Sequence, residues 1–291
     1  MATKTEPVRR TSEIEEATNR WFVHPAGRML LPWLVAWRIK PNTVSLLGMA
    51  CGLLAGFAYS HVPARPWLAL GFLLMVAWHV LDGVDGQLAR LTQTQSELGK
   101  VLDGVCDYIT FIAVYVALAL SLAPRDGDWV LWVVALAGAC HAVQAAAYEA
   151  QRQFYDVWGW GRGSRQLRGK VPDAKRSAFG LLHRLYGVLQ HLAVGNSLEM
   201  NAELGAVLQD APHRAESLRR RYRDTFAPSV RGWAVMSSNY RTAGIFLFAV
   251  AGFPMGYFLT EIVLLSPVCF WMIRRQNRRL AGFLRDLAVA A

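Results

Sequence analysis

The stretch PNTVSLLGMACGLLAGFAYSHVPA, residues 41–64, contains no Asp, Glu, Lys or Arg. Two further stretches share this property, residues 129–148 and residues 242–260. Runs of about 20 apolar residues can cross a hydrocarbon core of about 30 Å, since a helix rises about 1.5 Å per residue. A water-soluble chain with three such runs would need an unusually large core. The sequence therefore predicts an all-α integral membrane protein.

Working outward from these runs, we expect six transmembrane helices. Their expected bounds are residues 43–60, 67–90, 98–123, 129–155, 233–253 and 255–273. Lys and Arg gather in three segments, with seven up to residue 40, fifteen in 151–241 and five from residue 274 onward. By the positive-inside rule these segments and both termini are expected to be cytoplasmic. The net charge of +10 thus indicates a membrane surface, not nucleic acid.

The predicted organisation has five parts. They are a cytoplasmic or interfacial segment at residues 1–40, four transmembrane helices at 41–156, a basic cytoplasmic insertion at 157–232, two transmembrane helices at 233–275 and a cytoplasmic tail at 276–291. Residues 13–38 mix charge with Trp, Phe and Leu. This mixture is typical of an amphipathic helix lying in the interface, with Pro25 and Pro32 as possible breaks.

The insertion is polar and basic, and we expect it to be helical and outside the membrane. Residues 178–193 and 213–225 have the composition of amphipathic or charged helices. The second of these contains Arg219-Arg220-Arg221. That run fits either a solvated helix face or a surface that attracts anionic lipid headgroups.

Four aspartates lie beside two of the most apolar stretches. They are Asp82, Asp85, Asp103 and Asp107. Asp82 and Asp85 share one face of a helix, because each residue advances by about 100°. Asp103 and Asp107 are four residues apart and form one stripe with Gly99 on the next helix. The short link between the two helices is expected to bring the two faces together near the membrane surface.

Carboxylates grouped in this way restrict the chemistry of the site. Four of them cannot sit together at low dielectric without strong repulsion, and ionisable groups inside spans usually mark a function. Clustered oxygen ligands favour a hard cation, so we expect Mg²⁺ or Mn²⁺. Arg90 offers a fork for phosphate oxygens, while Gly86 and Ala89 leave room for a bulky ligand. The residues alone suggest metal-assisted phosphoryl chemistry.

A resemblance to the CDP-alcohol phosphotransferase family rests on eight fixed positions. They read Asp82-x-x-Asp85-Gly86-x-x-Ala89-Arg90 and, eight residues later, Gly99-x-x-x-Asp103-x-x-x-Asp107. The start of the first span, Pro41-Asn42-Thr43-Val44, also resembles the family's pattern. The resemblance covers about residues 41–275 apart from the insertion, and it implies a six-helix membrane core.

The resemblance also implies roles for these residues. The four aspartates would hold one or two divalent ions that bind the pyrophosphate of a CDP-linked substrate. The implied CDP-binding set is Asp82, Gly86, Ala89, Arg90, Gly99 and Asn42. Asp107 would be the general base that takes the proton from an acceptor hydroxyl, which attacks phosphorus as CMP leaves.

The expected function is transfer of a phosphatidyl or phospho-alcohol group from a CDP-linked donor to an alcohol. We favour CDP-diacylglycerol as the donor; the alternative is a CDP-alcohol such as CDP-choline with a lipid hydroxyl as acceptor. A second alternative, from another class, is a non-catalytic membrane binding protein or a transporter with an acidic cation site. The expected partners are the donor, an alcohol or phospho-alcohol acceptor and membrane lipids, without nucleic acid, and a homodimer is a further possibility.

Two arginines are candidates for binding a phosphate group on the acceptor. Arg152 is expected at the cytoplasmic end of the fourth span, and Arg241 lies within the fifth. A phosphorylated acceptor would need fixed cations of this kind. The other interpretation is that both arginines are ordinary positive-inside anchors that meet lipid headgroups.

Overall fold

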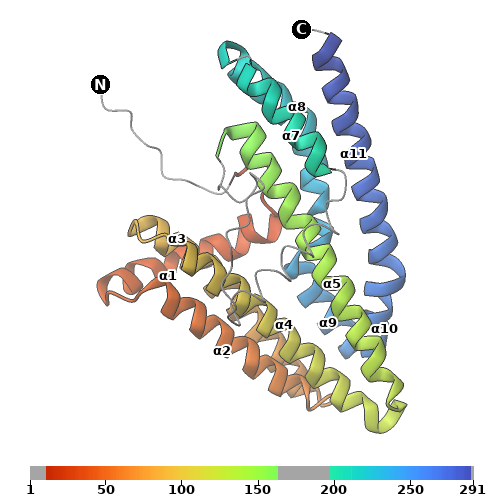
Figure 1. Ribbon diagram of the computed structural model, residues 1–291. Coiled ribbons are helices and arrows are strands. Elements are labelled where there is room, and N and C mark those ends of the chain that lie inside the picture. The colour runs from red at the N-terminus through yellow and green to blue at the C-terminus, as the bar shows by residue number, and fades with distance from the viewer. Residues whose placement is uncertain (1–10, 163–196, 211, 290–291) are drawn as a thin grey trace, which may run out of the picture. The chain divides into compact units, whose positions relative to one another are not determined.

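The computed structural model describes residues 11–162, 197–210 and 212–289 (Figure 1). These residues form helices and turns, and no strand occurs among them. Among these residues, five helices are long and apolar enough to cross a membrane. They are Pro41–Tyr59, Arg65–Leu91, Val101–Asp126, Trp129–Gly159 and Pro254–Ala288. The prediction of an all-α integral membrane protein is therefore confirmed.

The chain divides into two compact units. The first contains the residues up to Gly138 together with Ser238–Thr260, and the second contains Ala139–Ser237 together with the chain from Glu261 onward. The helix α5 (Trp129–Phe154) contributes to both. All four motif aspartates belong to the first unit.

Three long helices form the centre of the first unit. They are α2 (Pro41–Tyr59), α3 (Arg65–Leu91) and α4 (Glu97–Asp126), and they match the first three predicted spans within three residues at each end. α2 packs against both α3 and α4, and the three lie side by side in Figure 1. α9 (Ser238–Val250) packs against α3 and against α10 (Pro254–Leu259).

The ends of α3 and α4 have clear local causes. The Ser96 hydroxyl caps α4 by accepting the Gly99 N–H at 2.9 Å, which leaves a link of only five residues between the helices. α3 ends in a Schellman turn, in which Gln93 has a positive φ of 56° and the Thr94 N–H donates to the Ala89 carbonyl at 2.9 Å. Both ends fall beside motif positions, so the local backbone fixes where the motif residues lie.

Glycines on α2 allow the close packing of the central helices. Gly48, Gly52 and Gly56 are four residues apart and lie along one helix face. A Cβ at Gly52 would overlap the side chain of Thr110 on α4, and one at Gly56 would lie 2.9 Å from the backbone carbonyl of Ala113. Small residues at this spacing let membrane helices approach backbone to backbone.

The N-terminal segment is helical and lies against α3. A π-helical turn (Asn19–Val23) leads into α1 (His24–Ala36), which continues through Pro32 without a break. A Cβ at Gly83 of α3 would lie 2.8 Å from Val23, and one at Gly27 would lie 2.8 Å from Val84. Large side chains on the other faces are more than half exposed, as expected for an interfacial helix. They are Trp21, Phe22, Met29, Trp33 and Trp37.

The second unit is built from the rest of α5 and from helices that follow the undescribed segment. They are α7 (Ser197–Asp210), α8 (Ala215–Gly232) and α11 (Ser266–Val289). The predicted helix at 213–225 is confirmed and extends to Gly232, whereas the one predicted at 178–193 lies outside the described residues. The unit's apolar cluster joins side chains from α5, α11 and a 3-10 turn (Trp233–Met236).

The last two predicted spans differ in form from the prediction. Residues 233–253 contain the 3-10 turn, an extended Ser237 and then α9, whose 13 residues rise only about 20 Å. The helix that begins at Pro254 instead continues through a π-helical turn (Thr260–Leu265) to Val289, well past residue 273. Helix length alone therefore supports five crossings, and the sixth stays a prediction.

Candidate metal and substrate site

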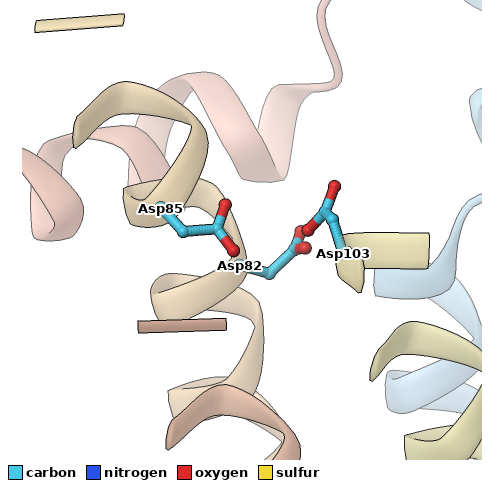
Figure 2. A group of neighbouring side chains, drawn as sticks. All are labelled: Asp82, Asp85 and Asp103. Carbon is cyan, nitrogen blue, oxygen red and sulfur yellow. The ribbon is translucent and has the colours of Figure 1, made fainter. Parts of the chain in front are cut away.

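Three carboxylates converge between α3 and α4. Asp82 and Asp85 come from the last turns of α3, and Asp103 comes from the second turn of α4. One oxygen from each lies within 4.8 Å of the others. Figure 2 shows the carboxylates of Asp82 and Asp103 next to each other, with that of Asp85 directed toward them. Asp85 is buried, and the other two are half-buried.

These three residues fit a divalent cation. Carboxylate oxygens are the ligands that Mg²⁺ and Mn²⁺ prefer. Around one octahedral Mg²⁺, with bonds of about 2.1 Å, ligand oxygens lie about 3–4 Å apart, so oxygens within 4.8 Å need only small side-chain shifts. Three negative charges at this separation also repel one another, and a cation between them would offset that repulsion.

Ser45 of α2 supports the cluster and was missed by the sequence analysis. Its hydroxyl donates a hydrogen bond of 2.5 Å to Oδ2 of Asp85, and both residues are buried. This bond fixes one carboxylate oxygen of Asp85. A sequence signal exists, because Ser45 lies one helical turn before Gly48 on the face with the small residues, but nothing in the sequence identifies Asp85 as its partner.

Asp107 lies on the same small cavity as the three converging aspartates, although it is not part of their close group. The cavity has about 160 Å³ of empty space. Its lining consists of Ser45, Gly48, Trp78, Asp82, Asp85, Asp103, Cys106 and Asp107. None of this space is wide enough for a water molecule, so these side chains leave no room for a nucleotide between them.

The other motif residues surround the ends of α3 and α4. The guanidinium of Arg90 lies over Gly86, where a Cβ would be 3.3 Å from Nη1. Asn42, at the start of α2, reaches Gly99 of α4, where a Cβ would be 3.4 Å from the Asn42 side-chain oxygen. The structure thus brings together the members of each of these pairs, all of which belong to the CDP-binding set that the family resemblance implies.

The two candidate acceptor arginines fall in different units. Arg241 is in the first turn of α9 and is only 2% exposed. Its neighbour Thr242 is hydrogen-bonded to His79 of α3 at 2.9 Å, which holds this turn against the helix that carries Asp82. Arg152 belongs to the second unit, where its guanidinium lies 3.6 Å from Glu149 and over the ring of Tyr148.

Known proteins are similar to a part of this chain. Cholinephosphotransferase 1 of Bos taurus is 34% identical over 116 residues, which cover 35% of this chain and 27% of that protein. CDP-diacylglycerol–serine O-phosphatidyltransferase of Mycobacterium tuberculosis is 34% identical over 115 residues, which cover 39% of this chain and 38% of that protein. The matched region therefore spans less than two fifths of each of these two relatives.

The family comparison extends further along the chain. The family model described as CDP-alcohol phosphatidyltransferase matches residues 38–192, which is more than half of the 291 residues. The matched region contains the complete eight-position motif, and the structure brings three of the motif's four aspartates into one close group. The chain belongs to the CDP-alcohol phosphatidyltransferase family.

Proposed function

We propose that this protein transfers a phosphatidyl group from CDP-diacylglycerol to the hydroxyl of an alcohol acceptor and releases CMP. The acceptor oxygen forms a bond to the phosphorus that carries the diacylglycerol, and the bond from that phosphorus to the CMP oxygen breaks. The observation that carries the proposal is the convergence of three carboxylates beside Asp107 in a chain of this family.

In this proposal Asp82, Asp85 and Asp103 hold one or two Mg²⁺ or Mn²⁺ ions. A divalent ion bound there would neutralise charge on the pyrophosphate as the leaving CMP departs. The protein side supplies a fixed set of oxygen ligands, since Ser45 orients Asp85 and the capped start of α4 positions Asp103. Such prearranged groups stabilise developing charge without reorganising during the reaction.

Asp107 is proposed as the general base. It lies one helical turn beyond Asp103 on α4 and lines the same cavity, but it is outside the close group of three. A carboxylate in that place can accept the proton of an acceptor hydroxyl as its oxygen attacks phosphorus. The remaining members of the motif would bind the nucleotide, with Gly86 and Ala89 leaving space for cytidine, Arg90 contacting phosphate, and Asn42 and Gly99 closing the opposite side.

For the identity of the donor, the relatives support two choices. The mycobacterial relative is named for CDP-diacylglycerol and serine, and the bovine one for choline phosphate transfer. We favour CDP-diacylglycerol, since the chain matches a larger share of the mycobacterial protein. A CDP-alcohol donor with a lipid hydroxyl as acceptor is the second candidate.

For the acceptor, we propose a phosphate group, and Arg241 and Arg152 are each a candidate to bind it. The burial of Arg241 argues against its role as a surface anchor, because an arginine that is 2% exposed does not meet lipid headgroups. Arg152 has a cation–π contact with Tyr148 and an ion pair with Glu149 that support a fixed position. Substituting either arginine by Ala should raise the KM of a phosphorylated acceptor about tenfold or more.

The proposal also includes orientation and assembly. The basic segments favour a cytoplasmic location for both termini and for the site. This allows a polar acceptor to arrive from water while a lipid donor arrives from the bilayer. A homodimer stays a prediction, which the mass of the purified protein in detergent will check.

The experiment that tests the proposal is release of radiolabelled CMP by the purified protein in lipid vesicles. Each donor is offered with a series of alcohols and their phosphates, with Mg²⁺ or Mn²⁺ and then with excess EDTA. We expect CMP only when donor, acceptor and metal are all present, and none with EDTA. Full activity in EDTA would rule out the metal assignment, and no CMP release with any pair would favour a binding protein or a transporter.

A further inference from the structure

A cluster of basic and aromatic side chains covers one face of α11, the blue helix in Figure 1. Its members, here termed the arginine face, line an open hollow of about 620 Å³. They are Phe270, Trp271, Arg274, Arg275, Arg278 and Arg279. At about 100° per residue they occupy a sector of about 180°. The opposite side of the helix is buried, as Cys269, Gln276 and Leu280 show.

The four arginines of this face are not neutralised by the rest of the described chain. None of them forms an ion pair with a described carboxylate. Arg221 of α8, by contrast, lies 3.4 Å from Asp286. Two of the four are held over aromatic rings, with Arg274 at 4.4 Å from the Phe270 centroid and Arg275 at 5.1 Å from that of Trp271. The face therefore presents partly oriented guanidinium groups to an external anion.

The position of the face along its helix indicates where that anion would be. The helix begins at Pro254, and about 20 residues at about 1.5 Å each cover a hydrocarbon core of about 30 Å, which places its end near residue 273. Phe270 and Trp271, 56% and 57% exposed, then lie at the edge of the hydrocarbon. The arginines begin one residue later, at the depth of lipid headgroups.

We propose that the arginine face binds the headgroup of an anionic phospholipid. Guanidinium groups pair with phosphate oxygens through two parallel hydrogen bonds, and exposed aromatic rings pack beside the first part of the acyl chains. A soluble phosphate could use the arginines but not the rings, so the lipid explains the whole cluster. This site is on α11 and does not depend on the proposed transferase activity.

Native mass spectrometry of the full-length protein tests this proposal, because it measures how much lipid the protein retains. The protein in neutral detergent is titrated with dioleoylphosphatidylglycerol and, separately, with dioleoylphosphatidylcholine. We expect tighter binding of the anionic lipid. In Arg274→Gln/Arg278→Gln, each lost charge should weaken that binding about fivefold, or about 25-fold together.

A matched control is Arg220→Gln/Arg231→Gln, which removes the same charge from two exposed positions on α8. It should weaken binding no more than about threefold. If both double variants lose the same affinity for the anionic lipid, the lipid is held only by the overall positive charge of the protein. The proposed site would then be wrong. Displacement of the lipid by millimolar pyrophosphate would instead indicate a soluble anion.

The melting temperature of each variant shows whether it has folded. If a variant does not fold, its lipid binding is not interpreted. The test then rests on the unaltered protein. If it retains phosphatidylcholine as strongly as phosphatidylglycerol, the proposal is wrong.

Discussion

At the scale of single residues, the structure places one of the four motif aspartates apart from the other three. Asp82, Asp85 and Asp103 form the close group, whereas Asp107 only shares their cavity. Ligands and a base need different places, because a base must reach the attacking hydroxyl rather than the ion. This geometry supports the proposed division of roles and makes the two roles separable by experiment.

The first prediction concerns this division of roles. Asp107→Asn should abolish CMP release and leave the affinity for the CDP-linked donor largely unchanged, because a proton acceptor is needed only for the chemical step. Asp82→Asn should weaken binding of both Mn²⁺ and donor. Turnover and equilibrium binding of radiolabelled donor measure the two effects. If Asp107→Asn loses donor affinity as severely as Asp82→Asn, then Asp107 is mainly a ligand.

A second prediction concerns Ser45, whose hydroxyl orients Asp85. Ser45→Ala should weaken Mn²⁺ binding about 10- to 100-fold, as loss of a residue that orients a metal ligand typically does. Ser45→Thr keeps the hydroxyl and should retain most of the Mn²⁺ affinity. Titration of Mn²⁺ followed by electron paramagnetic resonance gives the affinity without requiring turnover. Ser60→Ala, an exposed change at the end of the same helix, is the control. Equal Mn²⁺ affinity in all three variants would exclude the role.

At the scale of helices, the first four spans could be predicted because their causes are local. Apolar runs end at charges or prolines, and a Ser cap and a Schellman turn bound the link between α3 and α4. The pairing of Ser45 with Asp85 and of Gly52 with Thr110 could not be predicted, because the partners are 40 and 58 residues apart and their meeting depends on the packed helices. The motif indicated which residues form the site but not which of them touch.

A third prediction tests the close packing of α2 on α4. Gly52→Ala should destabilise the protein by about 1–3 kcal/mol, because the new methyl group overlaps the buried side chain of Thr110. The double variant Gly52→Ala/Thr110→Gly removes that overlap and should recover part of the loss. Thermal melting in detergent measures both. Gly282→Ala, with no atom within 4 Å of the added Cβ, is the control and should not lower the melting temperature. An unchanged melting point for Gly52→Ala would mean that the helices are further apart.

At the scale of the whole molecule, the number of crossings decides which side of the membrane each end occupies. In the part of the chain that the structure describes, five helices satisfy the length and composition of a span, and an odd number would separate the termini. α9 is short, but most of it lies in the uncharged run 242–260, and the chain turns just after it at Gly252, which has a positive φ of 76°. The Phe253 N–H then donates to the Phe248 carbonyl at 3.0 Å, and α9 packs against α10 across this turn. A hairpin of this kind supports a sixth crossing.

The last prediction follows from that hairpin, since six crossings return the chain to the side on which it began. In a background without the four native cysteines, Ser12→Cys and Ala288→Cys, both at exposed positions, should react with a membrane-impermeant maleimide only in inside-out vesicles. Phe253→Cys, at the exposed turn after α9, should react only in right-side-out vesicles. Reaction of Phe253→Cys on the same side as Ser12→Cys, with Ala288→Cys on the opposite side, would establish five crossings. The arginine face of α11 would then meet the outer leaflet, so this experiment also decides which leaflet must supply its anionic lipid.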